Sequence, residues 1–368
     1  MAQKLSSLFF STAKNLMRLQ RNALKLTKAL PIPRKKKVAA KTISKKVLVK
    51  QTLGMGAGNW CQYIYQRQPS STELLGELSY FIYRPPTRPL AGIPLVVVLH
   101  GCQQVAPEIA LGTGMNLLAD QQGFMVLYPQ QAKRVNDQHC WRWFEPDGEH
   151  GLAEADDIAG LIRATVARYK LDKARVYICG LSAGAAMAGM VAIRHPKLIA
   201  AVGMHSGPVL GDAHSGGSAM LTMRRGSTHD PTILVDGLLE GSSAFPGMPA
   251  IIVQGRKDHV VAMPNAQQLL QQFTYLNQLP LGLSSSSSLN HASAAVPVPK
   301  VDVLGKGTSR EYHRTDVIVG GDTVVRLCTV DHLGHAWSGG NPVVKFHAAR
   351  GPKASLLMWQ FFSKQRRA

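Results

Sequence analysis

The segment Val176–Gly184 constrains the fold most strongly, because an apolar strand-like run leads directly into the pattern Gly180-Leu181-Ser182-Ala183-Gly184. A GxSxG pattern between a strand and a helix is typical of a nucleophile elbow, in which the serine hydroxyl stands above the edge of a sheet. Mostly small residues follow, which lets the next helix pack closely under the turn. The segment therefore predicts Ser182 as a nucleophile and ester hydrolysis as its chemistry. A serine in an ordinary glycine-rich turn is the alternative.

From Leu78 onward, short β-branched runs alternate with longer helical stretches. This alternation predicts the α/β class, and with the elbow an α/β-hydrolase fold, in which helices flank a mostly parallel central sheet. Predicted strands cover residues 79–83, 94–100, 124–128, 175–179, 200–204, 250–254 and 323–330. Predicted helices cover residues 108–121, 153–169, 183–195, 264–278 and 354–362. The Gly-, Ser- and His-rich segment Ser206–Pro249 is interpreted either as a lid over the site or as a surface excursion.

Charge divides the chain into two predicted parts. Residues 1–50 hold 14 of the 42 Lys and Arg residues and none of the 22 Asp and Glu residues, so residues 51–368 carry a formal net charge of only +6. We predict a basic amphipathic N-terminal extension and linker over residues 1–50 and one α/β-hydrolase catalytic domain over residues 51–368. Within that domain, the serine-rich stretch 281–299 is predicted to be a flexible insertion.

The segment Lys4–Leu30 spaces apolar residues three or four positions apart among basic ones, which predicts a cationic amphipathic helix. Such a helix fits contact with a polymer granule or an anionic surface, and a solvated extension is the alternative. A secretory signal fits less well, because charges interrupt the apolar residues. No run of about 18 apolar residues exists, so no transmembrane segment is predicted. A nucleic-acid partner would depend on the tail charge alone, and no specific one is predicted.

The cysteines predict neither a disulfide scaffold nor a metal site. They are few and widely spaced, at Cys61, Cys102, Cys140, Cys179 and Cys328. Cys179 and Cys328 fall in predicted core strands, where a free thiol behaves as a small apolar residue. Because the sequence contains no CxxC or HExxH pattern, no metal and no cofactor are predicted.

An acid and a histidine are expected after the serine, in that chain order. The predicted strand 250–254 leads into a polar turn that would deliver Asp258 to the carboxyl edge of the sheet, where it would orient the base. His335 follows another predicted strand, in a loop where Gly334 gives the backbone freedom, and is the predicted general base. His332 is the alternative base. Alternative acids are Asp302, Asp316, Asp322 and Asp331.

The tetrahedral oxyanion of ester hydrolysis needs two backbone donors. The amide after the nucleophile, that of Ala183, is one of them. The other is expected in the loop after an early strand. There Leu99-His100-Gly101-Cys102 follows an apolar run, and the Cys102 amide is the best candidate. His100 is predicted to support this loop and not to act as a base.

Five ordered motifs are more specific than any one of them. They are LHGC at 99–102, CWRWFEP at 140–146, GLSAG at 180–184, QGRKD at 254–258 and LGHAWSGG at 333–340. Together they resemble the catalytic domain of poly(3-hydroxybutyrate) depolymerase-type esterases, a family that includes feruloyl and acetylxylan esterases. The resemblance implies the triad Ser182, Asp258 and His335 and the oxyanion amides of Cys102 and Ala183. It also implies that Trp143 and Trp337 line the acyl pocket, with a place in the core as the alternative for each.

Three features are compared with the pattern of this family. Family members usually read HAWPGG where this chain has Ser338, and the change is expected to soften the loop without removing chemistry. In secreted members, cysteines at positions like Cys102 and Cys140 could pair, and whether they pair here stays open. Secreted members also carry a signal peptide and often a binding module, neither of which is evident here. A cytoplasmic or granule-associated location is therefore favoured, with an extracellular one as the alternative.

The resemblance and the residues together predict a serine esterase that hydrolyses short hydroxyacyl esters. The preferred interpretation is a poly(3-hydroxybutyrate) depolymerase or a hydrolase of its oligomers. The first alternative keeps the machinery and acts on feruloyl or acetyl esters of plant polysaccharides. The second alternative is of another class, a granule- or membrane-surface binding protein with an inactive hydrolase domain.

Overall fold

The computed structural model describes residues 47–48, 55–66, 76–86, 89–145, 149–239, 245–278 and 300–367. The chain divides into the units Met1–Ile43 and Ser44–Ala368, and all the described residues belong to the second unit. The predicted helix Lys4–Leu30 and the predicted insertion 281–299 lie outside the described residues. The domain boundary expected after residue 50 stays a prediction, but two residues of the predicted linker form a short strand, β1.

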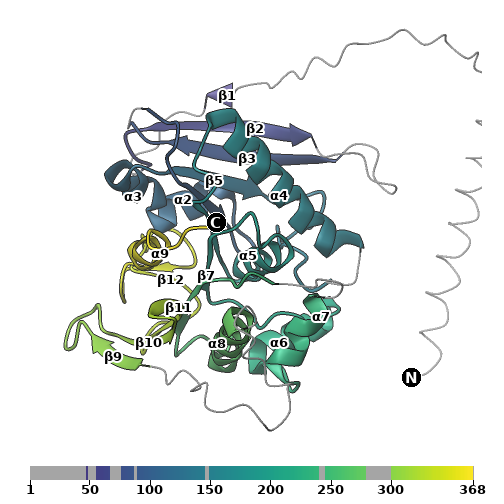
Figure 1. The fold of residues 1–368 in the computed structure, drawn as a ribbon, viewed down its shortest axis with the longest axis vertical. Helices are drawn as coiled ribbons and strands as arrows, with labels where there is room; N and C mark the ends of the chain where they lie inside the picture. The colour runs from purple at the N-terminus through teal and green to yellow at the C-terminus, as the bar shows by residue number, and fades with distance from the viewer. Residues whose placement is uncertain are drawn as a thin grey trace, which may run out of the picture. The chain divides into compact units, whose positions relative to one another are not determined.

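One large sheet organises the described residues, with strand order β1-β2-β3-β5-β4-β6-β7-β8-β11-β10-β9 (Figure 1). Its strands are β1 (Val47–Leu48), β2 (Asn59–Gln66), β3 (Glu77–Arg84), β4 (Leu95–Leu99), β5 (Met125–Gln130), β6 (Val176–Leu181), β7 (Ala201–His205), β8 (Ala250–Gly255), β9 (Lys300–Leu304), β10 (Tyr312–Val319) and β11 (Asp322–Val330). Two short strands, β12 (Trp337–Ser338) and β13 (His347–Ala348), form a separate parallel pair. In the large sheet, the six consecutive strands β5, β4, β6, β7, β8 and β11 run parallel to one another. The pairings on either side of this set are antiparallel.

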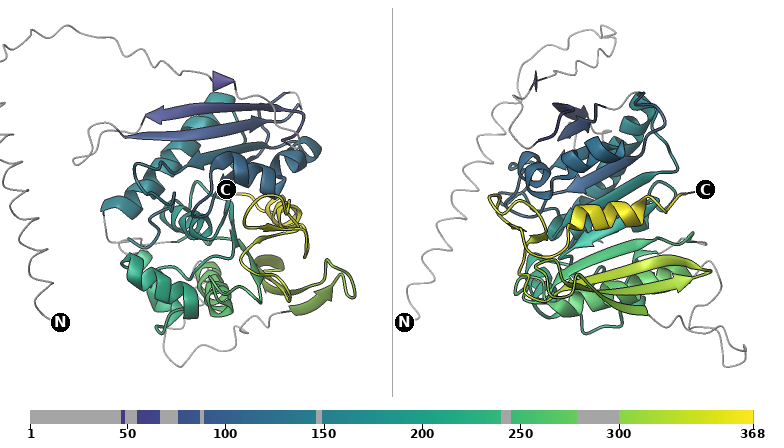
Figure 2. Two further views of the ribbon diagram at one scale, coloured as in Figure 1. Left: turned by 180° about the vertical axis from the view of Figure 1, so that it is seen from behind. Right: turned by 90° about the vertical axis from the view of Figure 1, so that its left-hand side faces the viewer.

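Helices cover both faces of the sheet (Figure 2). The helices α4 (Glu149–Tyr169), α5 (Ala183–Arg194) and α8 (Met263–Gln278) contribute to the core on one face. The helices α2 (Ala106–Thr113), α3 (Met115–Gln122) and α9 (Ala354–Phe362) contribute to the core on the other. The predicted α/β class with a mostly parallel sheet is confirmed.

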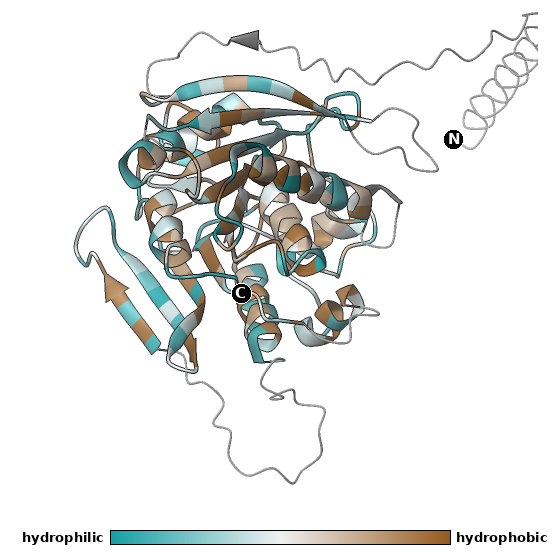
Figure 3. Cartoon of the chain, turned by 45° about the horizontal axis from the view of Figure 1, so that its top comes forward, coloured by the Kyte–Doolittle hydropathy of each residue, from teal (hydrophilic) through white to brown (hydrophobic). Residues whose placement is uncertain are grey.

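The strand β4 shows why the inner strands read as continuous apolar runs. Leu95, Val97 and Leu99 pack into the core on the face covered by α4, α5 and α8. Val96 and Val98 pack into the core on the face covered by α2, α3 and α9. Successive side chains of a strand point to opposite faces, so a strand with helices on both sides needs apolar residues at every position. All seven predicted strands are present within a few residues of their expected bounds. In Figure 3 the inner strands are predominantly hydrophobic.

The structure differs from the sequence prediction where local signals were weaker. The single helix predicted over residues 108–121 is two helices, α2 and α3, because Gly114 between them has a left-handed φ of 63°. The segment Ser206–Pro249 contains α6 (Gly216–Arg225) and α7 (Pro231–Leu238), both of which pack against α8. The strands β2, β9 and β10 were not predicted, since their partly exposed faces carry polar residues. Among the described residues, no helix is long and apolar enough to cross a membrane.

Two glycines allow the close contact between α5 and the sheet. A Cβ atom at Gly184 would lie 2.4 Å from the carbonyl oxygens of both Leu99 and His100. A Cβ atom at Gly180 would lie 2.3 Å from the carbonyl oxygen of Gly184. The first turn of α5 therefore lies against the end of β4 at a distance that only glycine permits.

We expect Gly184→Ala to lower the free energy of unfolding by about 1–3 kcal/mol, because its methyl group would force the helix away from β4. Urea unfolding followed by circular dichroism measures this change. The control is Gly237→Ala in α7, where an added Cβ meets nothing within 4 Å. The control should keep or raise stability, by up to about 1 kcal/mol. A Gly184→Ala protein as stable as the parent would contradict the close contact.

Candidate active site

The predicted site residues lie where parallel strands end. Cys102 follows β4, Ser182 follows β6, Asp258 follows β8 and His335 follows β11. The carboxyl ends of parallel strands meet at one edge of the sheet, where ligands bind in open α/β folds. In the strand order, β7 lies between β6 and β8, so its last residue, His205, stands among these loops.

Ser182 occupies a strained turn between β6 and α5. It has φ 56° and ψ −120°, a conformation that costs free energy for a residue with a side chain. Its N–H donates to the carbonyl oxygen of His205 at 2.9 Å, and its own carbonyl accepts from the N–H groups of Ala185 and Ala186. The turn expected from the GxSxG pattern is present and is held by hydrogen bonds on both sides.

Asp258 and His335 form a hydrogen-bonded pair. The Nδ1 atom of His335 lies 2.8 Å from Oδ2 of Asp258. The other carboxylate oxygen accepts from the N–H groups of Val260, at 3.0 Å, and Val261, at 2.8 Å. Burial acts to raise the pKa of Asp258, but the bonds from His335, Val261 and Val260 outweigh it and hold the pKa below its ordinary value. An ionised carboxylate thus orients the imidazole and leaves its Nε2 atom available for proton transfer.

The alternative acids and the alternative base named from the sequence either pair with other residues or lie exposed. Three competing carboxylates pair with arginines: Asp302 with Arg314, Asp316 with Arg326, and Asp331 with Arg256. Asp322 and His332 are exposed. In the described part of the chain, neither makes a hydrogen bond with Asp258 or His335. The geometry therefore favours Asp258 and His335 over these alternatives.

Ser182 and His335 are connected indirectly in this structure. Across the residues that the structure describes, no hydrogen bond joins the Ser182 hydroxyl to the His335 ring. His205 bridges the two segments, because it bonds to Ser182 through its carbonyl oxygen and to Ser338 through its ring.

The two backbone donors expected for an oxyanion have no hydrogen-bond acceptor in the described part of the chain. In the loop after β4, the N–H of Gly101 donates to Gln104 Oε1, that of Gln103 to the carbonyl of Gln138, and that of Gln104 to the carbonyl of Gly101. The N–H groups of Cys102 and Ala183 have no acceptor among the described residues. A Cβ atom at Gly101 would lie 3.6 Å from Cβ of Ser182, so this loop adjoins the predicted nucleophile.

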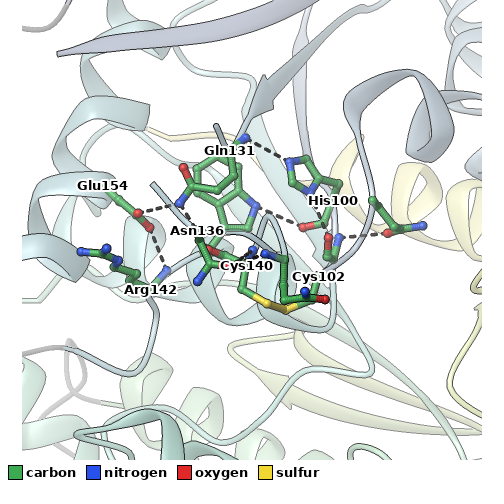
Figure 4. The surroundings of a disulfide bond; sticks show 11 residues. His100, Cys102, Gln131, Asn136, Cys140, Arg142 and Glu154 are labelled. Carbon is green, nitrogen blue, oxygen red and sulfur yellow. Dashed lines mark hydrogen bonds between the residues drawn. A yellow bond between two sulfur atoms is a disulfide. The ribbon is translucent and has the colours of Figure 1, made fainter. Parts of the chain in front are cut away.

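A disulfide joins Cys102 to Cys140, a pairing that the sequence left open (Figure 4). The carbonyl oxygen of Cys140 accepts from Gln131 Nε2 at 3.3 Å. The buried carboxylate of Glu154, on α4, accepts from Gln131 Nε2 at 2.6 Å and from the N–H of Arg142 at 2.8 Å. The bridge therefore connects the loop of the predicted oxyanion donor to a segment that α4 holds in place.

His100 supports this loop as a neutral imidazole (Figure 4). Its Nε2 atom accepts from the N–H of Gln131 at 3.1 Å, so the ring proton is on Nδ1, which donates to the carbonyl of Gly101 at 2.9 Å. Burial lowers the pKa of His100 to about 4. These contacts agree with the predicted role of His100 as a support and not a base.

The two tryptophans expected to line an acyl pocket lie in the interior. Trp337 is completely buried, stacks on His205 with ring centroids 5.0 Å apart, and donates through Nε1 to Ser355 Oγ. For Trp337 the structure favours the alternative that the sequence left open, a place in the core, because the core encloses its ring. Trp143 is 5% exposed and contacts Phe144 edge-on. A substrate contact by Trp143 stays a prediction.

Sequence reasoning missed two residues that lie near His335. His205 is fully buried at the end of β7, and its position at the carboxyl end of a predicted strand is the signal that could have found it. Phe346 has a φ of 61°, unusual for a bulky residue, and its ring lies edge-on to His335 at 6.3 Å. No sequence pattern distinguishes Phe346 from an ordinary loop aromatic.

Comparison with known protein families identifies the family of this chain. A family model described as Esterase PHB depolymerase matches residues 78–286. The chain belongs to this family. Four of the five motifs that suggested the resemblance lie within this match, which spans more than half of the sequence, and LGHAWSGG at 333–340 lies outside it.

Two depolymerases from other organisms match this chain over part of their length. Poly(3-hydroxyalkanoate) depolymerase C of Paucimonas lemoignei is 36% identical over 202 residues, which are 54% of this chain and 48% of the relative. Poly(3-hydroxybutyrate) depolymerase of Ralstonia pickettii is 26% identical over 278 residues, or 72% of this chain and 53% of the relative. The chain thus spans about half the length of these two relatives.

A solved structure confirms the fold of this family member. Acetyl xylan esterase from Aspergillus awamori superposes with a TM-score of 0.59, at 20% identity, over 82% of this chain and 98% of its own. At this identity the likeness shows the fold alone. The predicted α/β-hydrolase fold is confirmed.

Stability should fall as the pH is lowered below about 6.5, the ordinary pKa of histidine. Burial lowers the pKa of His100 to about 4 and that of His205 to about 3. Between the unfolded and folded pKa values only the unfolded chain binds these protons, so each histidine lowers the free energy of unfolding by about 1.4 kcal/mol per pH unit of acidification. Urea titrations at pH values from 6 to 4.5 give the free energy of unfolding as a function of pH. The slope of this free energy against pH should be smaller by this amount in His100→Gln than in the parent. An unchanged slope would contradict a neutral, buried His100.

The double variant Cys102→Ala, Cys140→Ala should lose both stability and turnover. The bridge spans 38 residues, and its loss should cost about 3 kcal/mol of unfolding free energy. A less fixed Cys102 amide should lower kcat by about tenfold, less than the 10²–10³-fold cost of removing an oxyanion donor. A reducing agent should lower the urea midpoint of the parent and leave that of the variant unchanged. Equal responses of the two proteins would rule out a stabilising bridge.

Proposed function

We propose that the chain is a serine carboxylic ester hydrolase, with Ser182 as nucleophile, His335 as general base and Asp258 as the acid that orients it. The 2.8 Å hydrogen bond between His335 Nδ1 and Asp258 Oδ2, at the same sheet edge as the strained Ser182, carries this proposal. Membership of the esterase PHB depolymerase family supports it.

In the acylation half-reaction, Ser182 Oγ attacks the ester carbonyl carbon while His335 Nε2 takes the hydroxyl proton. The negative oxygen of the tetrahedral intermediate accepts hydrogen bonds from the N–H groups of Cys102 and Ala183. His335 then gives its proton to the departing alkoxide as the carbon–oxygen bond breaks, which leaves the acyl group on Ser182. Asp258 remains ionised and stabilises the protonated imidazole.

Deacylation repeats these steps with water as the nucleophile. His335 takes a proton from water, and the hydroxide attacks the acyl carbonyl carbon. The bond to Ser182 Oγ breaks as His335 returns the proton to it, and the product is a carboxylic acid. The same two amides stabilise this second oxyanion, so one site serves both half-reactions.

Short hydroxyacyl esters are the proposed substrates, as the polymer or as its oligomers. Similarity to a poly(3-hydroxyalkanoate) depolymerase and a poly(3-hydroxybutyrate) depolymerase supports this class. The second candidate is an acetyl or feruloyl ester of a polysaccharide. Acetylxylan esterase A of Talaromyces purpureogenus supports it, at 33% identity over 135 residues, which are 36% of this chain and 34% of the relative.

Contact with a polymer granule or anionic surface through residues 1–50 remains part of the proposal. Its support is the basic amphipathic pattern of that segment. The Cys102–Cys140 disulfide bears on location, because disulfides persist in oxidising compartments. It therefore supports the extracellular alternative over the cytoplasmic expectation.

Substitutions in the triad should separate the proposed residues from the sequence alternatives. We expect Ser182→Ala and His335→Ala each to lower kcat for a 3-hydroxybutyrate trimer by about 10⁴-fold or more, and Asp258→Asn by about 10⁴-fold. The matched controls His332→Ala and Asp331→Asn should stay near the parent rate. Loss of activity in His332→Ala, with His335→Ala active, would overturn the assignment. Methyl ferulate, assayed in parallel, distinguishes the two substrate classes.

A further inference from the structure

We propose that His205 is a positioning residue that couples two segments of the site. One is the turn Gly180–Gly184, here called the nucleophile turn, and the other is the segment 331–338, here called the base loop. The amide of Ser338 is the partner of His205 in this coupling. The inference rests on the proposed function, since it concerns how Ser182 and His335 are held relative to each other. Neither residue is among those assigned to the triad or to the oxyanion donors. His205 does not touch the reacting atoms and acts through the segments it joins.

The main chain of His205 holds the nucleophile. As the last residue of β7, it is paired with Leu181 in β6, the residue before Ser182. Its carbonyl oxygen accepts the N–H of Ser182 at 2.9 Å. A shift of His205 would therefore move the strained turn that presents the Ser182 hydroxyl.

The side chain of His205 holds the base loop. Its Nε2 atom accepts the N–H of Ser338 at 2.9 Å, and its ring stacks on Trp337 at 5.0 Å with an interplanar angle of 23°. Trp337 and Ser338 follow His335 closely in the chain, so one ring fixes two residues next to the base. The bond spans 133 residues of sequence and is buried.

The hydrogen bonds define the protonation state of this ring. Because Nε2 accepts from an amide, the proton is on Nδ1, which lies 3.1 Å from Ser206 Oγ. The titratable groups that act on His205 are His335, Asp258 and His347. Burial, followed by the nearby His335, lowers the pKa of His205 to about 3. The ring therefore stays neutral and keeps its acceptor while His335 gains and loses a proton.

Ser338 is well suited to this coupling. It is completely buried, and its hydroxyl donates to the carbonyl of Pro352 at 2.7 Å while its amide donates to His205. The softening of the loop expected from Ser338 stays a prediction, and in the structure the amide and the hydroxyl of this residue are both hydrogen-bonded. A proline at this position would have no N–H to offer to His205.

The two variants His205→Phe and His205→Gln test the coupling in the full-length protein. Phenylalanine can stack on Trp337 but has no acceptor, whereas the Oε1 atom of glutamine can replace Nε2. With p-nitrophenyl butyrate, His205→Phe should lower kcat roughly 10- to 100-fold with KM within about twofold, since small misplacements of reacting groups have effects of this size. His205→Gln should recover most of this loss. A folded His205→Phe with the parent kcat, or a His205→Gln no better than it, would overturn the proposal.

Two variants at Ser338 test the same coupling, and their result does not depend on whether His205→Phe folds. Ser338→Pro removes the amide donor and the hydroxyl, and Ser338→Ala removes the hydroxyl alone. We expect kcat in Ser338→Pro to be at least about fivefold below that in Ser338→Ala, since displacement of the base loop slows proton transfer. Equal kcat in the two variants would contradict a role for the amide.

A measurement on the parent protein completes the test. Nitrogen NMR of the histidine rings at pH 7 should show His205 as the Nδ1–H tautomer, and the Nε2–H tautomer would refute the bond to Ser338. A fluorophosphonate that labels the parent at Ser182 establishes the proposed function separately. If the folded parent is not labelled, the proposed function is overturned. If the parent is labelled but His205→Phe has the same kcat as the parent, the coupling alone is overturned.

Discussion

The contact between Gly184 and the carbonyl oxygens of Leu99 and His100 is the constraint on which the site depends. It brings the first turn of α5 against the end of β4 at a separation that excludes any side chain at position 184. The same contact sets Ser182 beside the loop that carries the free Cys102 amide. Because nucleophile and oxyanion donors must be placed within fractions of an ångström, rigid backbone packing serves this purpose better than side-chain contacts.

Two buried histidines support the two sides of this arrangement. His100 holds the loop after β4 through the carbonyl of Gly101, and His205 joins the turn at Ser182 to the segment after β11. Each ring accepts a backbone N–H at Nε2, so each is fixed as one neutral tautomer. Both sit at the carboxyl ends of strands that neighbour β6, which is where ring and backbone can act on the elbow together.

The sequence predicted what depends on local patterns. Inner strands such as β4 are apolar at every position because both faces are covered, and the chain order of Ser182, Asp258 and His335 follows from where parallel strands end. The last two strands in the sheet order, β10 and β9, mix polar with apolar residues, lack that signal and were missed. Contacts distant in sequence were also beyond local patterns. Trp337 was expected at the substrate but is enclosed by the core, and the bond from Ser338 to His205 has no local signature.

The central claim is that the hydroxyl of Ser182 carries the acyl group during turnover. Its most direct test is an acid quench of the protein during hydrolysis of a 3-hydroxybutyrate ester, followed by peptide mass spectrometry. The account predicts the acyl mass on the peptide that contains Ser182, and its absence from that peptide in Ser182→Ala. An acyl group found on another residue, or turnover that continues in Ser182→Ala, would contradict the account.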